Sequence, residues 1–489
     1  MRFPSLLVAA SVLCVVSGLS QTTKPTNTGT SDARAIEAEI HAVETGLLPA
    51  VVVTGDSHSQ RTLTEEMTRR HIPAVSVAVI HNGTLRWAHA WGTLNPEGGP
   101  LATSDSLFQA ASISKSLASM AALHLVQEGK LSLDAPVQTE LKSWTLPQNS
   151  FTAKQPVTLR ELLSHTAGTN VHGFPGYATT DPVPTLQQVL DGVKPANTEA
   201  IRVITLPGQA FSYSGGGFTI AQQMMIDATG QSFPQIMQSL VLGPVAMRHS
   251  TYQQPLPSDR LKEVALPADE QGKPIAGGPH TYPEMAAAGL WTTPSDLALW
   301  IIEMQRSLKG DANHVLSQEM TRLMVTKVKD DYGLGVGVNN DNGQPSFAHS
   351  GGNAGYRTFY IGFENGEGAV IMTSSDGGGA LYPDILRSIS NVYKWTTWKT
   401  KERAALKLPE SALSRYAGKF TAQDVGEIEI TLQSGHLEAN FPNYGSTAIF
   451  PFASNEFFAT DLDAEIHFDS PDSGKVIAGT QSISFSRAH

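Results

Sequence analysis

The sequence predicts a mixed α/β (α+β) domain followed by a small all-β domain. Three observations predict this organisation. Strand patterns open and close the first 398 residues, helical and loop segments fill the middle, and short strand-like segments dominate from residue 412 onward. Of the 489 residues, 40% are hydrophobic and 16% are charged, so the chain can bury large cores.

The first 20 residues have the composition of a secretory signal peptide. Arg2 precedes an apolar run, residues 6–16, and small residues follow it. This run is too short for a comfortable membrane span. We therefore expect an exported protein, periplasmic or secreted, with no stable membrane span after cleavage. The only cysteine, Cys14, lies inside the run, so the mature chain would form no disulfide.

The next segments introduce the first domain, which we expect over residues 33–398. Residues 21–32 are polar and rich in turn formers, and are expected to form a flexible leader. A helical pattern follows in residues 33–48. Residues 71–92 are typical of a β-hairpin, because valines alternate before an Asn82-Gly83 turn.

The remainder of this domain changes character twice. From residue 104 to about residue 310, helical and loop segments dominate. Three strand-like segments joined by glycine-rich turns then follow, at residues 346–352, 356–363 and 369–375. We therefore expect one antiparallel sheet, assembled from both ends of the domain and flanked by helices, with a helical lobe between.

A charged segment, residues 399–411, is expected to be a linker. Beyond it, residues 412–489 contain short strands at close spacing, which predict a small barrel or sandwich.

The charge of the chain limits its partners. There are 34 Lys and Arg residues against 45 Asp and Glu residues, a formal net charge of -11. This acidity argues against nucleic acid or an anionic membrane as a partner. The sequence contains neither paired cysteines nor a His-x-x-x-His cluster, so no pattern of this kind indicates a metal site. We expect no metal and no organic cofactor.

Ser112 and Lys115 are three residues apart at the start of an apolar helix that Gly129 ends. Residues at this spacing share one helix face, so the lysine amine can lie beside the serine hydroxyl. Serine needs such a base, because its free hydroxyl hardly ionises, and a buried lysine amine can act as one. The alternative is a small polar residue near a helix end, the commoner fate of an isolated Ser-x-x-Lys pattern.

A second candidate group surrounds Tyr213, which lies on a turn just before Gly215 and a predicted helix. A phenol near a lysine ammonium can shuttle a proton. Taken alone, a packing tyrosine with a hydrogen-bonded tip is the alternative.

A third group begins at His349, on a predicted strand that continues through Ser350, Gly351 and Gly352. The edge of such a strand can bind an extended substrate. The backbone N–H of Gly352 could also complete an oxyanion hole with that of Ser112. Taken in isolation, the stretch favours the alternative, an ordinary glycine-rich turn with an incidental histidine.

Taken together, these motifs resemble, in order, the three motifs of serine β-lactamases and penicillin-binding proteins: Ser112-Ile113-Ser114-Lys115, Tyr213-Ser214-Gly215 and His349-Ser350-Gly351. The likeness is closest to the group of class C β-lactamases, D-Ala-D-Ala carboxypeptidases and family VIII esterases. It covers roughly residues 33–395 and is supported by residues 157–170, 286–300 and 332–338.

The resemblance implies a β-lactamase/transpeptidase-like fold and a serine hydrolase mechanism. Ser112 would form an acyl-enzyme, Lys115 would help to deprotonate it, and Tyr213 would pass the proton to the leaving group. The strand from His349 to Gly352 would align the substrate and hold the oxyanion. The C-terminal domain resembles the lipocalin-like β domain appended to some of these hydrolases.

Two positions depart from the family pattern. The second motif often ends in Asn, and Gly215 removes the side-chain amide that would contact a substrate amide. The third motif is often Lys-Thr-Gly, and His349 offers less fixed positive charge to a substrate carboxylate. Both changes lower our expectation of efficient β-lactam hydrolysis.

The leading hypothesis is an exported serine hydrolase that acts on peptides of D-amino acids or on small esters. One alternative is a penicillin-recognising or peptidoglycan-sensing protein that is acylated without turnover. Others are an efficient class C-like β-lactamase, and a ligand-binding C-terminal domain on an inert scaffold. The sequence does not fix the preferred substrate or the oligomeric state.

Overall fold

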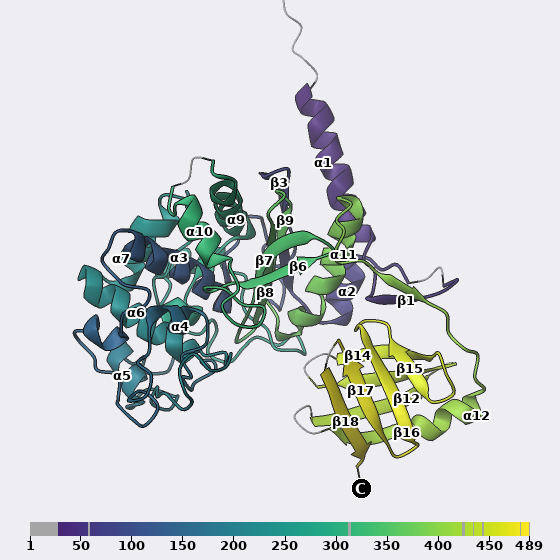
Figure 1. The fold of residues 1–489 in the computed structure, drawn as a ribbon. Helices are drawn as coiled ribbons and strands as arrows, with labels where there is room; N and C mark the ends of the chain where they lie inside the picture. Colours follow the sequence, from purple (N-terminus) through teal and green to yellow (C-terminus); the bar gives the residue numbers. More distant parts are fainter. Residues whose placement is uncertain are drawn as a thin grey trace, which may run out of the picture.

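A six-stranded antiparallel sheet, built from two distant parts of the chain, organises the larger unit of the molecule (Figure 1). The computed structural model describes residues 28–56, 59–311, 314–422, 426–433, 435–442, 445–479 and 481–488. The strand order is β3-β2-β9-β8-β7-β6. The bounds are β2 Ala74–His81, β3 Thr84–Gly92, β6 Gly337–Asp341, β7 Gln344–Asn353, β8 Tyr356–Phe363 and β9 Gly368–Thr373.

This sheet confirms the prediction that both ends of the domain contribute strands. β2 pairs with β3 on one side and with β9 on the other. The predicted hairpin turn has positive φ at both central residues, 53° at Asn82 and 71° at Gly83. Such a turn matches the twist of the two strands that it joins. The edge strand β6 was not predicted from the sequence, because its polar pattern resembles a loop.

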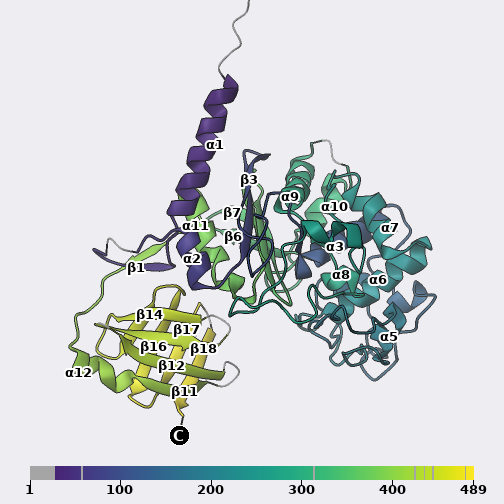
Figure 2. The same cartoon turned by 180° about the vertical axis from the view of Figure 1, so that it is seen from behind.

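Helices cover both faces of the sheet. Alternate residues of β2 divide between the faces: Val75 and Val77 pack against α1, α2 and α11, while Ala78 and Ile80 belong to the core shared with α9 and the helical lobe. In Figures 1 and 2 the helical lobe lies on the opposite side of the sheet from α1 and α11. The helix bounds are α1 Thr28–Thr45, α2 Leu63–Arg69, α9 Pro294–Lys309 and α11 Tyr382–Val392.

The helical lobe fills the middle of the chain, as the sequence predicts. Its core is continuous with one face of the sheet, for example where Trp300 of α9 packs edge-on against Tyr360 of β8 at 5.3 Å between ring centroids. A short antiparallel pair joins the start of the lobe to its later part: β4, Phe108–Gln109, pairs with β5, Trp291–Thr292. The helices are α3 Ser114–Gln127, α4 Leu159–Leu163, α5 Leu186–Asp191, α6 Gly215–Thr229, α7 Phe233–Met237, α8 Met285–Ala288 and α10 Gln318–Met324.

The C-terminal unit is a closed barrel of eight strands, which confirms the predicted small all-β domain. Successive strands pair antiparallel, and β11 pairs with β18 to close the barrel. Tyr416, just before β11, packs on Phe457 and Phe468. The strands are β11 Gly418–Ala422, β12 Gly426–Gln433, β13 His436–Phe441, β14 Gly445–Pro451, β15 Glu456–Ala459, β16 Ala464–Ser470, β17 Ser473–Ala478 and β18 Gln481–Arg487.

The segment expected to be a linker contains regular structure. Within residues 399–411, β10 (Lys401–Arg403) pairs in parallel with β1 (Val51–Val53), and α12 (Glu410–Leu413) begins. Strand pairing needs only backbone hydrogen bonds, so β10 can pair while its charged side chains remain at the surface. For this reason the charged composition of the segment resembled that of a linker. The barrel contacts this pair, since the Val51 N–H donates to the Thr460 carbonyl at 2.9 Å.

The predicted signal peptide, residues 1–20, and most of the predicted leader lie outside the described residues. Helix α1 begins at Thr28 and so includes the end of the segment expected to be a leader. Arg86 of β3 binds this helix through Asp32, at 2.7 Å, and Glu39, at 2.9 Å. Within the part of the chain that the structure describes, we find no helix whose length and hydropathy suit a membrane span.

Candidate active site

Ser112 and Lys115 lie side by side where the helical lobe meets the sheet. Ser112 is in a single 3-10 turn, Ala111–Ile113, that leads directly into α3. The spacing of three residues brings Lys115 Nζ within 3.0 Å of Ser112 Oγ. The same amine donates to the carbonyl of Ala287, in α8, at 2.7 Å, and Lys115 is 2% exposed. The amine is therefore held against the serine hydroxyl and shielded from bulk water.

The backbone around Ser112 is strained and closely packed. Ala111 has a φ of 51°, which is costly for a residue with a Cβ and is maintained only by the surrounding structure. Strand β7 approaches this turn so closely that a Cβ at Gly351 would collide with the Ala110 carbonyl and the Thr358 hydroxyl. The glycine of the third motif thus permits the strand to lie against the serine turn.

Strand β7 has an outer edge, the side that faces away from β8. Among the described residues no strand pairs with this edge after Ala348, which is the half of β7 that passes the serine turn.

 In a two-residue hairpin the residues that flank the turn form a hydrogen-bonded pair, and here these are Asn353 and Tyr356. Pairing then alternates along an antiparallel ladder, so the N–H groups of Ser350 and Gly352 point away from β8. On that side β6 ends at its pair Gly337 with Ala348, and no strand of the described residues continues it.

Tyr213 approaches the same amine from the turn that leads into helix α6. Ser214 caps this helix, because its side chain accepts from the Gly217 N–H, and this fixes the preceding tyrosine at the cleft. Lys115 Nζ lies 5.1 Å from the centroid of the Tyr213 ring. The ring of His165 packs against Tyr213 at 4.2 Å between centroids.

His165 is a residue of this site that the sequence analysis did not single out. It is buried, and its Nδ1 accepts the backbone N–H of Ser214 at 3.1 Å. Burial, and secondarily the charge of Lys115, lower the pKa of His165 well below its usual range. The imidazole is therefore neutral and positions the Tyr213 segment. The segment 157–170 supplied the family likeness, but nothing in its pattern shows that the histidine ring reaches Tyr213.

Burial keeps His349 neutral, and its contacts show which ring nitrogen carries the hydrogen. Its Nδ1 lies 2.5 Å from the carbonyl of Ser350, which can only accept, so the ring hydrogen is on Nδ1. Its Nε2 then accepts from the hydroxyl of Tyr332 at 3.0 Å. Burial, and secondarily Lys115, lower the pKa of His349 to about 4. Both nitrogens are engaged, so the ring offers no positive charge to a substrate.

A cleft of about 850 Å³ brings the three motifs together. One wall is the loop 172–175 with Tyr213, and the other is the β7 edge with the turn that follows it. Tyr282 joins the two walls, since its hydroxyl donates to the Pro175 carbonyl at 3.3 Å and accepts the Ala354 N–H at 3.2 Å. The lining residues are Ser112, His172, Gly173, Phe174, Pro175, Tyr213, His349, Ser350, Gly352, Asn353, Ala354, Arg357 and Asp376.

Gly215, the departure in the second motif, is covered by the loop wall. A Cβ at this position would lie 2.9 Å from Cε2 of Phe174 and 3.2 Å from the His172 carbonyl. The aromatic ring therefore takes the space that a larger side chain at position 215 would need. The sequence analysis does not single out Phe174, because its contact with Gly215 joins segments that are separate in the sequence.

A buried carboxyl, that of Glu284, lies directly before α8, the helix whose Ala287 carbonyl accepts from Lys115. Glu284 precedes α8, is fully buried, and neither of its carboxyl oxygens has a hydrogen-bond partner among the described residues. Burial raises the pKa of Glu284 to about 8. The group is therefore protonated at neutral pH.

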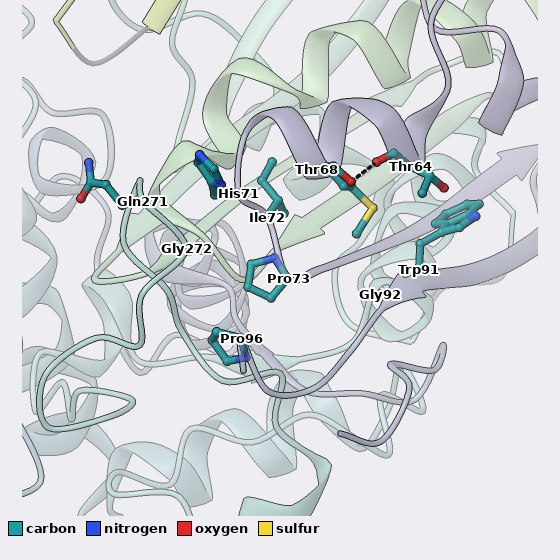
Figure 3. A pocket seen from close by; sticks show the side chains of 11 residues that line it. Thr64, Thr68, His71, Ile72, Pro73, Trp91, Gly92, Pro96, Gln271 and Gly272 are labelled. Carbon is teal, nitrogen blue, oxygen red and sulfur yellow. Dashed lines mark hydrogen bonds between the residues drawn. The ribbon is translucent and has the colours of Figure 1, made fainter. Parts of the chain in front are cut away.

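A second cavity, of about 430 Å³, is lined by none of the motif residues. Figure 3 shows His71, Pro73, Trp91 and Pro96 around it, with Thr64 and Thr68 on helix α2. Its lining includes no serine and no lysine, so it has no counterpart of the Ser112–Lys115 pair. Among the residues that the structure describes, no group of three or more His, Cys, Asp or Glu side chains is arranged to hold a metal ion.

Comparison with protein families gives two matches. Residues 60–393 match the model described as Beta-lactamase, which includes all three motifs and both walls of the cleft. Residues 402–487 match a domain of unknown function, DUF3471, which corresponds to the barrel.

Individual relatives agree with the first match. The chain is 26% identical to Protein flp of Staphylococcus aureus (strain MW2) over 264 residues, 51% of this chain and 49% of that protein. The chain therefore spans about half the length of that relative. It is 21% identical to Penicillin-binding protein 4* of Bacillus subtilis (strain 168) over 444 residues, 83% of this chain and 92% of that protein.

Among solved structures, the fold is similar to that of the octameric penicillin-binding protein homologue from Pyrococcus abyssi. The TM-score is 0.59 at 20% sequence identity, and the match covers 86% of this chain and 98% of that one. The likeness extends the agreement to the fold, with its mixed α/β architecture.

Proposed function

The chain belongs to the beta-lactamase family of serine hydrolases, and on that premise we propose that it cleaves amide or ester bonds through an acyl-enzyme on Ser112. The observation that carries the proposal is the 3.0 Å contact between Lys115 Nζ and Ser112 Oγ, in a site where the amine is also held by the Ala287 carbonyl. This contact supplies a base to a hydroxyl that is otherwise a poor nucleophile.

In the acylation step, Ser112 Oγ attacks the substrate carbonyl carbon while its proton passes to Lys115 Nζ. The carbonyl oxygen becomes an oxyanion, which the N–H groups of Ser112 and Gly352 would stabilise. The proton then passes by way of Tyr213 to the leaving amine or alcohol, and the acyl group remains on Ser112. Attack by water on the ester carbonyl, with a proton returned to Ser112 Oγ, completes the cycle.

The proposed substrates are peptides that contain D-amino acids, or small esters, with weak or no β-lactamase activity. Support comes from the two departures in the motifs. Phe174 occupies the space beside Gly215, and His349 uses both nitrogens within the protein. Neither position offers the side-chain amide or the ammonium group that the motifs often supply.

Two other functions use the same serine. A penicillin-recognising or peptidoglycan-sensing protein would be acylated but would not turn over. An efficient class C-like β-lactamase would turn over β-lactams fastest. Relatives named penicillin-binding proteins make penicillin the natural probe for both alternatives.

We also propose that the protein acts outside the cytoplasm, on the strength of the signal-like residues 1–20, and that residues 412–489 form a separate domain. The substrate is a small molecule or a peptide. Whether the chain assembles, as its octameric structural neighbour does, is tested by its mass in solution.

The test uses purified residues 21–489 with a fluorescent penicillin, a p-nitrophenyl ester and a D-alanyl-D-alanine peptide. Ser112→Ala and Lys115→Ala are the variants. Intact mass reports the acyl-enzyme and absorbance or chromatography reports turnover. We expect Ser112→Ala to abolish both signals in a folded protein, and Lys115→Ala to slow acylation by about 1,000-fold or more.

The substrate that turns over fastest decides between the functions. Stable labelling by penicillin without turnover of any substrate would favour the sensor, and fast penicillin hydrolysis would favour the β-lactamase. Unchanged turnover in Ser112→Ala would refute the mechanism.

A further inference from the structure

The cleft contains one arginine, Arg357, that no motif includes. It lies on β8 directly opposite Gly352, so its side chain extends over the residue whose N–H faces the substrate. A Cβ at Gly352 would lie 3.5 Å from Arg357 Nη1, which shows how close the guanidinium is to the strand edge. Figure 1 shows β7 and β8 side by side in the sheet.

The guanidinium is fixed through one of its nitrogens. Nη1 donates to the backbone carbonyls of Asn353 and Tyr356, at 2.8 and 2.9 Å, and forms an ion pair with Oδ1 of Asp376 at 2.8 Å. Asp376 is itself held by the Gly355 N–H at 3.0 Å. No hydrogen bond to Nη2 or Nε is found among the described residues, and the side chain is 33% exposed. Those two nitrogens present donors in the fork that matches a carboxylate.

Charge in the cleft leaves Arg357 as the group that can attract an anion. His349 is neutral with both nitrogens engaged, and Lys115 is buried against Ser112 and Ala287. The other charged residue of the lining, Asp376, repels anions but orients the guanidinium. A substrate carboxylate that enters the cleft therefore meets its favourable partner at Arg357.

We propose that Arg357, oriented by Asp376, binds a carboxylate of the substrate and makes this site selective for acidic substrates. The proposal rests on the proposed function, because it assigns the substrate class of that same site. The carboxylate can belong to the leaving group or to the acyl group, and the two are distinguished by the choice of probe.

The first experiment compares matched acids and amides. N-acetyl-D-alanyl-D-alanine and its C-terminal amide differ in the leaving group. The mono-p-nitrophenyl ester of glutaric acid and its terminal amide differ in the acyl group, after subtraction of spontaneous hydrolysis. We expect the wild-type protein to prefer the acid in at least one pair by about 10-fold or more in kcat/KM, mainly through KM.

Arg357→Met should remove that preference, because it should lower kcat/KM for the acid about 10-fold more than kcat/KM for the amide. Asp376→Asn keeps an acceptor for Arg357 and Gly355 but removes the negative charge, so it should increase the preference for the acid severalfold. Arg322→Met is the matched control, since Arg322 pairs with Glu364 on the exposed surface at 2.6 Å and does not line the cleft. It should behave as wild type.

The proposal is overturned if the wild-type protein shows no preference in either pair, or if Arg357→Met retains it. It is also overturned if Arg357→Met slows acid and amide equally, because the arginine would then only hold the turn after β7.

Calorimetry in the Ser112→Ala background separates this proposal from the reaction. N-acetyl-D-alanyl-D-alanine and glutarate should bind more tightly than their amides, and Arg357→Met should abolish the difference. If the Ser112→Ala protein, with Arg357 present, binds acid and amide equally well, the role of Arg357 is refuted even if Ser112 is the nucleophile. Retained turnover in Ser112→Ala would sink the acyl-enzyme while the binding measurement still decided the role of Arg357.

Discussion

The two larger antiparallel sheets, the six-stranded sheet and the barrel, differ in whether their edges are paired and in how many polar side chains are buried beside them. The barrel pairs every strand, and among its described residues the buried polar or charged side chains are Thr447 and Thr460. The six-stranded sheet leaves the outer edge of half of β7 unpaired beside Ser112, and the surrounding lobe buries Lys115 and Glu284. Closure removes an edge that could bind another chain, whereas the open edge is available to a substrate.

The largest effect should come from placing a methyl group in each sheet. Gly351→Ala pushes β7 away from the Ser112 turn, and we expect kcat/KM to fall by about 1,000-fold, as when an oxyanion donor is lost. Gly474→Ala in the barrel would meet Cζ of Phe485 at 2.7 Å and the His467 carbonyl. It should lower the free energy of unfolding of the barrel by about 1–3 kcal/mol and leave activity unchanged.

Steady-state kinetics and differential scanning calorimetry measure both variants side by side. Equal loss of activity in the two variants would contradict the separation of the sheets.

The buried carboxyl should make only the larger unit sensitive to alkali. The pKa of Glu284 is about 8 in the folded protein against 4.5 for an exposed carboxyl. Between these values the folded state retains a proton that the unfolded state has lost, so the free energy of unfolding falls as pH rises through this window. Glu284→Gln should raise it at pH 9 by on the order of 4 kcal/mol and change it little at pH 4.5.

The melting temperatures of the two units, followed from pH 4.5 to 9, check this expectation. A wild-type protein whose larger unit keeps one melting temperature throughout would count against it.

His349 should produce the opposite dependence at acid pH. Its pKa is about 4 in the folded protein against 6.5 for an exposed histidine, so the unfolded state binds the extra proton as pH falls between these values. The larger unit should lose on the order of 3 kcal/mol over this window because of this residue alone. The free energy of unfolding of His349→Gln, measured with urea between pH 4 and 7, should depend less steeply on pH than that of the wild type. An unaltered pH dependence would argue against a neutral His349.

The smallest effect is expected where the two units meet on the surface. Lys401 pairs with Asp463 of the barrel at 2.6 Å, and both side chains are about 60% exposed. Such pairs contribute little because water and salt screen them, so Lys401→Ala should lower the free energy of unfolding by less than about 1 kcal/mol. A larger loss in chemical denaturation would indicate that the junction, rather than each sheet, determines stability.

Local patterns predicted much of this architecture. The hairpin at Asn82-Gly83 follows from alternation and a turn that favours positive φ. The adjacency of Ser112 and Lys115 follows from helical spacing. Short strands at close spacing were predicted within residues 412–489, although β11 and β17 are hard to recognise because both are short and rich in polar or small residues.

The contacts that define the cleft could not be predicted in the same way. Phe174 covers Gly215, Tyr332 donates to His349, and Arg357 lies over Gly352. Each joins residues that only the folded chain brings together, and none of the three motifs includes Phe174, Tyr332 or Arg357. The motifs therefore indicated which residues to examine, while their charge state and surroundings depend on tertiary packing.

The assembly of the six-stranded sheet from both ends of the domain also sets an order for synthesis. β2 pairs with β9, so Val75 must wait for Thr373 to leave the ribosome before that ladder can form. The helical lobe is made in between and can begin to fold first. In a nascent chain stalled before β6, the valine-rich face of the β2–β3 hairpin would have α1 and α2 beside it but would lack α11, and chaperones would have to protect the apolar surface left exposed.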